Sequence, residues 1–474
     1  MPFDVTDPCT GERLETFPAL DPASCDALLT ELQVRQQRWR TIPVTERARA
    51  IEALATALRT HRETLARTLS REMGKPIMAA RAEVDKCIAL CTVAPTMATA
   101  ALTDEVLRDD ADAFVVTRYA PLGVVLAIMP WNFPYWQALR LAVPTLLAGN
   151  GICIKPAPSV PGTALALARC FADAREALRQ DTSGATALAS AVPWAVAFIE
   201  EQDLDAVIAD PRIAGVSLTG SDRAGRHVAE VAGRHLKKVV LELGGSDPFI
   251  VLPDADLDEA ARVAVAARTV NSGQSCVAAK RFIVCEAVYD AFLSRFVEGM
   301  RALVMGDPQD ERTQIGPIAT ARVRDGLAAQ VATSVRAGAR VLLGGDASGL
   351  PGFFYPPTVL VDVPDSAPAA CDELFGPVAA VFRVATEAEA IARANATPFG
   401  LGASVWTQSS AAADRCIAAL EAGMVYVNDM VVSDPRIPFG GVKASGMGRE
   451  LGPIGYREFT NVQTVHRRRR PMSP

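Results

Sequence analysis

Near the start of the chain, apolar residues recur at the spacing of a helix over one long stretch. Between residues 45 and 72 the apolar positions share one face, as in Ala48, Ile51, Leu54 and Leu58. Thr45 is a candidate N-cap and Gly74 a candidate stop. The pattern predicts one helix that ends before Gly74.

Short apolar or β-branched runs then alternate with helical stretches through the rest of the chain. Buried parallel strands read as continuous apolar runs, so this alternation predicts an α/β fold with largely parallel sheets. The runs form two series, which predicts two doubly wound lobes. The first series is 123–129, 151–155, 215–219, 238–243, 248–252 and 281–284, and the second is 341–345, 357–363, 377–384, 403–407 and 424–428.

Composition narrows the class of protein. The 474 residues carry a formal charge of −6, which gives no basic field for nucleic acid. We find no signal peptide and no apolar window long enough to span a membrane. Ten sparse cysteines indicate a reducing compartment, so we expect a cytoplasmic protein without a metal site. We interpret the basic run at 466–470 as a solvated tail.

One cysteine stands in a distinctive setting. Cys276 ends the segment NSGQSC at 271–276, and VAAKRFIV follows it. We interpret VAAKRFIV as a helix followed by a strand, which would place the thiol where backbone N–H groups favour a thiolate. The alternative is a small buried hydrophobe, the usual state of a free cysteine.

Glu242 interrupts the apolar strand LELGG at 241–245. If it is buried in apolar surroundings, the pKa of its carboxyl rises toward neutrality, which suits a general base. The alternative is a glutamate exposed at the end of a strand. The local sequence leaves both interpretations open.

Three further motifs could bind a ligand. Asn132 lies in the rigid turn PWNFP at 130–134 and could donate to an oxyanion, although a turn or cap asparagine is the alternative. Lys155 follows a predicted strand, where ligands of α/β sheets bind, or it is a surface lysine. Gly220 and Ser221 precede a predicted helix whose N-terminus could hold a phosphate group. The chain has no GxGxxG fingerprint.

Seven motifs follow one another in order: PWNFP, KPAP, TGS, LELGG, NSGQSC, ELFGP at 373–377 and PFGGVKASGMGRE at 438–450. Their order and spacing, from about residue 5 to 465, resemble the aldehyde dehydrogenase superfamily. Within it, LELGGSDPFIV and GQSCVAAKRFIV are most similar to bacterial NAD(P)-dependent succinate-semialdehyde dehydrogenases.

The resemblance implies roles for individual residues. Cys276 would be the nucleophile, Glu242 the base that activates water, and Asn132 with the Cys276 backbone N–H the oxyanion hole. The implied cofactor contacts are Trp131, Lys155, Pro156, Ala157, Pro158, Gly220, Ser221, Leu243 through its backbone, Glu373 and Phe375.

Two departures from the family pattern concern the cofactor. Many NAD-preferring members carry a glutamate at the position of Pro158, where it would bind the adenosine ribose and repel a 2′-phosphate. Its absence favours NADP+, with NAD+ as the alternative. The segment between 169 and 198 lacks the usual Gly-x-Pro turn and is longer than in relatives.

For the substrate, the resemblance implies Arg140 and Ser433 as contacts to the distal carboxylate of succinate semialdehyde. A second arginine of that clamp is replaced by Val270, and Arg436 is a candidate substitute. The alternatives are oxidation of another small aliphatic or aromatic aldehyde, transfer of the acyl group to CoA, a thiol hydrolase, or a catalytically inactive scaffold. The presence of Glu242 favours hydrolysis over CoA transfer.

The family architecture also implies three domains. Residues 1–102 and 122–243 would form the NAD(P)-binding domain, and residues 244–448 the catalytic domain. Residues 103–121 and 449–474 would form a small β-extension that makes the protein a homo-oligomer, either a dimer or a tetramer.

Overall fold

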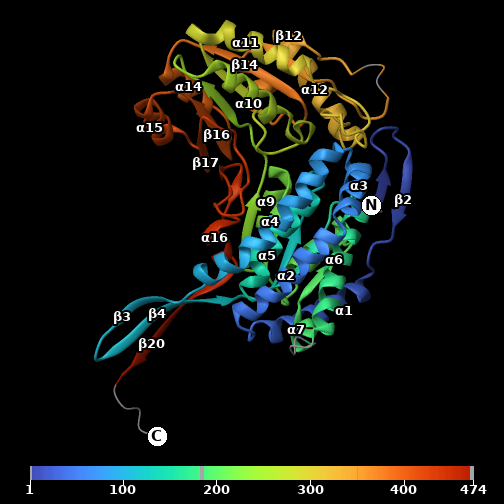
Figure 1. Ribbon diagram of the computed structural model, residues 1–474, viewed down its shortest axis with the longest axis vertical. Coiled ribbons are helices and arrows are strands. Elements are labelled where there is room, and N and C mark those ends of the chain that lie inside the picture. The colour runs from blue at the N-terminus through green and yellow to red at the C-terminus, as the bar shows by residue number, and fades with distance from the viewer. Residues whose placement is uncertain (1–2, 182–185, 348, 350, 470–474) are drawn as a thin grey trace.

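The chain folds into two α/β bodies and a projecting β-arm (Figure 1). The structure, a computed structural model, describes residues 3–181, 186–347, 349 and 351–469. Each body is built around a mainly parallel sheet, so the predicted fold class is confirmed. No helix in these described ranges is long and apolar enough to cross a membrane.

The first sheet has the strand order β19-β9-β8-β5-β6-β7 and is parallel except where β19 pairs with β9. The apolar runs predicted four of these strands. They did not predict β7 and β19, because three and two residues are too few to show a pattern. The bounds are β5 (Val124–Ile128), β6 (Gly151–Lys155), β7 (Trp194–Val196), β8 (Ile213–Thr219), β9 (Lys238–Glu242) and β19 (Gly446–Met447).

Helices bury both faces of this sheet. In β5, Val124 and Leu126 join one hydrophobic cluster, whereas Val125 and Ala127 join another. This alternation explains why the strand reads as a continuous apolar run. The covering elements are α1 (Pro22–Trp39), α2 (Val44–Thr60), α3 (Arg62–Met73), α4 (Ile77–Ala101), α5 (Pro134–Leu147), α6 (Pro161–Gln180), α7 (Thr186–Ala191), η1 (Glu201–Asp203), α8 (Leu204–Ala209) and α9 (Asp222–Arg234).

The second sheet has the order β12-β13-β14-β11-β10-β16-β17, with only β12 and β13 antiparallel among its pairs. All seven strands were predicted, but the runs at 248–252 and 281–284 were grouped with the first series and in fact form β10 and β11 of this second sheet. They are β10 (Pro248–Val251), β11 (Arg281–Cys285), β12 (Arg340–Leu343), β13 (Thr358–Val361), β14 (Val378–Val384), β16 (Gly402–Trp406) and β17 (Met424–Val427). The helices of this body are α10 (Leu257–Thr269), α11 (Glu286–Arg301), α12 (Ala321–Ala337), α13 (Pro368–Cys371), α14 (Glu387–Asn395) and α15 (Ser410–Ala419).

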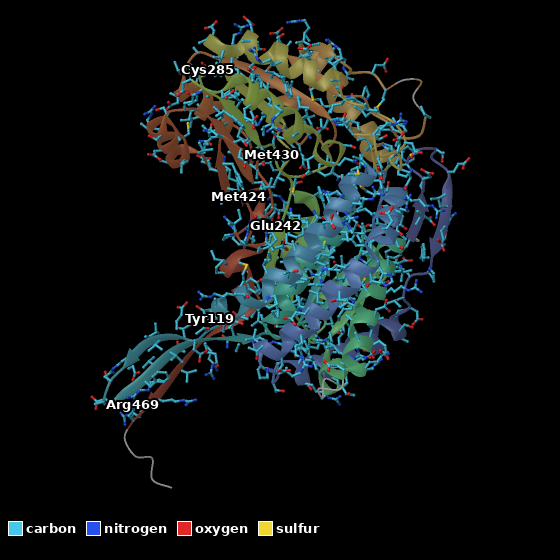
Figure 2. All side chains as sticks on the ribbon, viewed as in Figure 1. Tyr119, Glu242, Cys285, Met424, Met430 and Arg469 are labelled. Carbon is cyan, nitrogen blue, oxygen red and sulfur yellow. The ribbon has the colours of Figure 1, made fainter. Side chains whose placement is uncertain are left out.

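The arm is a three-stranded antiparallel sheet of β3 (Glu105–Asp109), β4 (Ala113–Pro121) and β20 (Thr460–Arg468). It projects away from both bodies, with Tyr119 near its base and Arg469 near its tip (Figure 2). Residues 466–468 of the expected solvated tail are exposed as expected, but they form a strand that pairs with β4 and are not a free tail. Residues 470–474 lie outside the described part of the chain.

Small elements complete the chain. They are a hairpin of β1 (Phe3–Thr6) and β2 (Arg13–Phe17), a short pair of β15 (Phe399–Gly400) and β18 (Val442–Lys443), the turn η2 (Val270–Gly273), and α16 (Gly452–Arg457). The unusual segment 169–198 contains the end of α6, then α7 and β7, and its residues 182–185 lie outside the described ranges.

The single helix predicted over residues 45–72 is in fact two helices. His61, with φ −97° and ψ 8°, separates α2 from α3, and its ring contacts Asp173 at 2.7 Å. The break escapes the sequence pattern because the buried apolar face continues across it from Leu58 to Leu65, and His61 keeps its backbone bonds to Ala57 and Leu65. Pro43, rather than Thr45, is the N-cap. Gly74 ends α3 with φ 76°, which confirms the predicted stop.

Candidate active site

Four neighbouring strands of the first sheet end along one edge. The PWNFP loop follows β5, while β6, β8 and β9 end at Lys155, Thr219 and Glu242. Carboxyl ends of parallel strands are where α/β sheets bind ligands. Figure 2 shows Glu242 at the end of the first body that faces the second.

A pocket of about 230 Å³ opens at this edge. It brings together the three predicted catalytic residues Asn132, Glu242 and Cys276. Most of the predicted cofactor contacts share its wall: Trp131, Gly220, Ser221, Leu243, Glu373 and Phe375. The rings of Trp131 and Phe375 meet edge to face, with 5.6 Å between centroids.

Asn132 is held by a buried ion pair that the sequence analysis did not identify. Lys75 pairs with Glu83 in the interior, and the Lys75 ammonium also donates to the Asn132 carbonyl at 2.8 Å. The Glu83 carboxylate accepts the backbone N–H groups of Tyr135 and Trp136, each at 3.0 Å, at the start of α5. The asparagine therefore has a fixed backbone, as an oxyanion donor requires.

The loop before Cys276 is sharply turned and packed against that asparagine. Asn271, Ser272 and Gly273 have φ values of 54°, 55° and 77°, and a Cβ on Gly273 would come within 2.3 Å of the Gly376 backbone. The Asn271 side chain donates to the Asn132 carbonyl at 2.9 Å. Only glycine fits at position 273, where the loop meets the ELFGP segment.

The expected loop-to-helix junction at Cys276 is wrong. The residues after the cysteine form a turn that leads into β11, with no helix between them. Burial raises the pKa of the Cys276 thiol to about 12, while the charges of Lys280 and Arg140 act in the opposite direction. The free protein therefore holds this cysteine as a neutral thiol at neutral pH.

Lys280 is a positive group in direct contact with the cysteine loop. Its buried ammonium donates to the carbonyls of Ser275, at 2.9 Å, and of Cys276, and lies 3.7 Å from the Glu373 carboxylate. Glu373 also accepts the Gly245 backbone N–H at 3.0 Å. A lysine four residues after the cysteine was visible in the sequence, but nothing there indicated its burial.

Glu242 is buried, with 1% of its surface exposed, so the solvent-exposed alternative is wrong. Among the described residues, neither of its carboxylate oxygens has a hydrogen-bond partner. Burial raises the pKa of this carboxyl well above its ordinary value, and the charge of Glu450 raises it further. An unpartnered carboxyl with a raised pKa in a pocket wall is suited to general base catalysis.

A second pocket, of about 560 Å³, adjoins the first and shares Pro130, Thr219 and Gly220 with it. Lys155, Ala157 and Pro158 line it, as the resemblance implied, whereas Pro156 does not. Ser221 is the N-cap of α9 and accepts the Ala224 backbone N–H at 3.3 Å, so the predicted helix start is correct. The buried Thr219 hydroxyl, between the two pockets, has no partner among the described residues.

The predicted substrate residues lie on α5 and in the loop between β17 and β18, and both already have partners. Arg140 is buried, pairs with Glu450 through Nε, and stacks on Phe439 at 4.3 Å. Ser433 accepts the indole N–H of Trp136 at 3.2 Å. Neither residue is part of the lining of the pocket that holds Cys276.

The candidate substitute for the missing arginine is already paired. The Arg436 side chain is mostly exposed and makes two bonds to the Asp434 carboxylate, at 2.9 and 2.6 Å. Gln137 of α5, which the sequence analysis missed, lines the pocket instead, and its Oε1 has no partner in the described structure.

A buried glutamate, a cysteine on a strained loop and a fixed asparagine at the junction of two α/β bodies define a class of enzymes. The model of the aldehyde dehydrogenase family matches residues 1–465, and the chain belongs to this family.

Individual relatives and solved structures show which members of the family the chain resembles. The chain is 46% identical over 472 residues to succinate-semialdehyde dehydrogenase (NADP+) 1 of Mycobacterium ulcerans, covering 98% of this chain and 99% of that protein. It superimposes on succinic semialdehyde dehydrogenase from Streptococcus pyogenes, solved with NADP+, with a TM-score of 0.91 and 33% identity over 98% and 99% of the two chains. An NAD-dependent aldehyde dehydrogenase from Sinorhizobium meliloti matches with a TM-score of 0.92 and 33% identity over 100% and 93%.

Proposed function

We propose that the protein oxidises succinate semialdehyde to the carboxylate with NADP+. The observation that carries the proposal is the shared pocket of Cys276, Asn132 and Glu242, which opens into a larger pocket at the carboxyl ends of the first sheet. The names of the relatives from Mycobacterium ulcerans and Streptococcus pyogenes support this substrate and cofactor.

The residues present fit a nicotinamide dinucleotide. Lys155, Pro158 and Gly220 would hold it in the larger pocket, and the unpartnered Thr219 hydroxyl lies where that pocket meets the smaller one. Trp131, Glu373 and Phe375 would hold its nicotinamide half in the smaller pocket. When bound, the cofactor supplies the hydride acceptor for the oxidation.

The first half of the reaction is nucleophilic. The Cys276 sulfur attacks the aldehyde carbon, and the thiol gives its proton to water in the pocket, because the resting thiol is neutral. The Asn132 amide and the Cys276 backbone N–H donate to the oxygen that becomes an oxyanion. Loss of hydride from the carbon leaves a thioester on the cysteine.

The second half is hydrolysis. Glu242 takes a proton from water as the water oxygen attacks the thioester carbon. The carbon–sulfur bond then breaks, the carboxylic acid leaves, and Glu242 returns the proton to the Cys276 sulfur. The raised pKa of Glu242 makes it a stronger base than an exposed glutamate. An unpartnered base in the pocket supports water as the acyl acceptor over CoA.

The cofactor pocket supports NADP+ over NAD+. Pro158 contributes no carboxylate where NAD-preferring relatives carry one, and Arg223 adds a second cation to Lys155 on the wall. Glu200 and Glu201 line the same pocket, and the charge of Glu201 acts on the Lys155 ammonium. NAD+ is therefore the second cofactor to test.

The deciding experiment measures NAD(P)H formation with succinate semialdehyde and with butanal, which has the same four carbons without the carboxylate. We expect a higher kcat/KM for succinate semialdehyde and for NADP+. An equal kcat/KM for both aldehydes would remove the substrate from the proposal. If wild type forms no NAD(P)H with any aldehyde, and Cys276→Ser gives the same signal as wild type, the protein is an inactive scaffold.

The same proposal extends to assembly and location. The arm of β3, β4 and β20 exposes Val106, Leu107 and Val462, which supports a role in homo-oligomerisation. The strand change from β9 to β10 supports our division into a cofactor domain and a catalytic domain near residue 243. Ten free cysteines support a cytoplasmic location.

A further inference from the structure

Lys86 lies on α4 with its ammonium in a partly buried position and without a counter-ion. Its Nζ is 4.2 Å from the centroid of the Trp136 ring, on the helix that follows the Asn132 loop. Throughout the described ranges, no carboxylate lies within salt-bridge distance of this nitrogen. A partly buried lysine without a counter-ion is costly unless an anion binds it.

Two predicted substrate residues are connected to this lysine through Trp136 and α5. Trp136, which carries the Lys86 ammonium on its ring, donates its indole N–H to Ser433. Arg140 is on the same helix as Trp136, one turn further along, and its charge acts on both Lys86 and Cys276. Arg140 uses Nε for Glu450, while its buried Nη2 has no partner among the described residues.

We propose that Lys86 is the second cation of the clamp for the distal carboxylate of the substrate, and that it takes over the role of the arginine that is absent at Val270. The carboxylate lies between the Lys86 ammonium and the free Nη2 of Arg140, with the Ser433 hydroxyl as a third donor. This inference rests on the proposed function, because it presumes a substrate with a second anionic group.

The electrostatics of the cluster favour such an anion. Burial and the charge of Arg140 lower the pKa of Lys86 to about 8, and Glu83, Cys87 and Asp434 act in the opposite direction without pairing with it. Asp434 is engaged by Arg436. A bound carboxylate would offset the repulsion between the two cations and hold Lys86 protonated.

The test compares Lys86→Met and Lys86→Arg with wild type, using succinate semialdehyde and butanal at saturating NADP+. We expect Lys86→Met to raise the KM for succinate semialdehyde about tenfold, in keeping with the loss of one charge-assisted bond, and Lys86→Arg to restore it. The KM for butanal and both kcat values should stay within about twofold. Lys238→Met is the matched control, since Lys238 lies on the surface and pairs with Glu458 at 3.0 Å.

The pH dependence gives a second readout. The wild-type KM for succinate semialdehyde should rise as the pH increases through about 8, where Lys86 loses its proton, and the KM for butanal should not. In Lys86→Met this dependence should disappear. A tenfold rise that is equal for both aldehydes, or a KM for succinate semialdehyde that Lys86→Met leaves unchanged, would overturn the role of Lys86.

Failure of the proposed function is separately visible. If wild type does not favour succinate semialdehyde over butanal, the substrate is wrong and the inference about Lys86 is overturned with it. If wild type does favour it and Lys86→Met keeps that preference, only the role of Lys86 is overturned.

Discussion

Replacing Arg140 by methionine should have two separable effects, because its guanidinium pairs with Glu450 and its Nη2 is free. Loss of the free nitrogen removes a contact to the substrate carboxylate. Loss of the pair leaves the Glu450 carboxylate buried without a counter-charge close to Glu242. The single variant therefore mixes a binding effect with a catalytic and a structural one.

The size of the effect on stability follows from the burial of the Arg140–Glu450 ion pair. Both side chains are 2% exposed, so removing one partner should lower the free energy of unfolding by about 3–5 kcal/mol. Replacing both, in Arg140→Met with Glu450→Gln, should restore most of it. The coupling energy in this double-mutant cycle should thus be on the order of 3 kcal/mol.

The same cycle separates binding from catalysis. The charge of Arg140 lowers the pKa of Glu242 and that of Glu450 raises it. Arg140→Met alone should therefore raise this pKa further and reduce kcat for every aldehyde at neutral pH, and the added Glu450→Gln should recover kcat. The KM for succinate semialdehyde, relative to that for butanal, should stay high in both variants.

The assays are urea unfolding followed by tryptophan fluorescence, and initial rates with both aldehydes. Additive changes in the free energy of unfolding would refute the buried ion pair. If the double variant keeps the wild-type ratio of the KM for succinate semialdehyde to the KM for butanal, Arg140 does not contact the substrate carboxylate. This conclusion holds even if kcat behaves as described.

Three further predictions test other parts of the site. Glu242→Gln should lower kcat by about 10²–10⁴ and keep a first-turnover burst of NAD(P)H in stopped-flow absorbance, and loss of the burst would contradict a role limited to hydrolysis. Pro158→Glu should lower kcat/KM for NADP+ at least about tenfold relative to NAD+, because a carboxylate repels the 2′-phosphate, and an unchanged ratio would count against this pocket. Val462→Asp, at a position 64% exposed on β20, should reduce the mass measured by light scattering, and an unchanged mass would mean that this face of the arm is free.

The sequence predicted the strands well because both sheets are buried on both faces. In β5 and β10, neighbouring residues belong to different hydrophobic clusters. Every position is therefore apolar, and the strand is visible in the sequence as a continuous apolar run. Boundaries that depend on a single backbone conformation were missed. His61 divides one helix into two without interrupting the apolar face, and the turn after Cys276 reads like the start of a helix.

The residues that share a motif could be predicted, but those that act through space could not. Asn132, Glu242 and Cys276 each lie in a recognisable segment, and the fold brings them to one pocket. The Lys75–Glu83 pair that holds the Asn132 loop carries no local signal of its burial. The role of this pair follows only from the fold, which brings the segment before α4, α4 itself and the start of α5 together.

Burial links two of the catalytic residues, Glu242 and Cys276, to charges that lie far away in the sequence. Arg140 and Glu450 are 310 positions apart, yet their charges act in opposite directions on the pKa of Glu242. Arg140 also acts on Cys276 and on Lys86. An anion bound next to Arg140 would therefore change the pKa of Cys276 and of Glu242, in addition to its interaction with the clamp. A substrate that carries its own carboxylate would then alter the catalytic groups on binding, and the kcat for butanal should respond to an added carboxylate such as propionate.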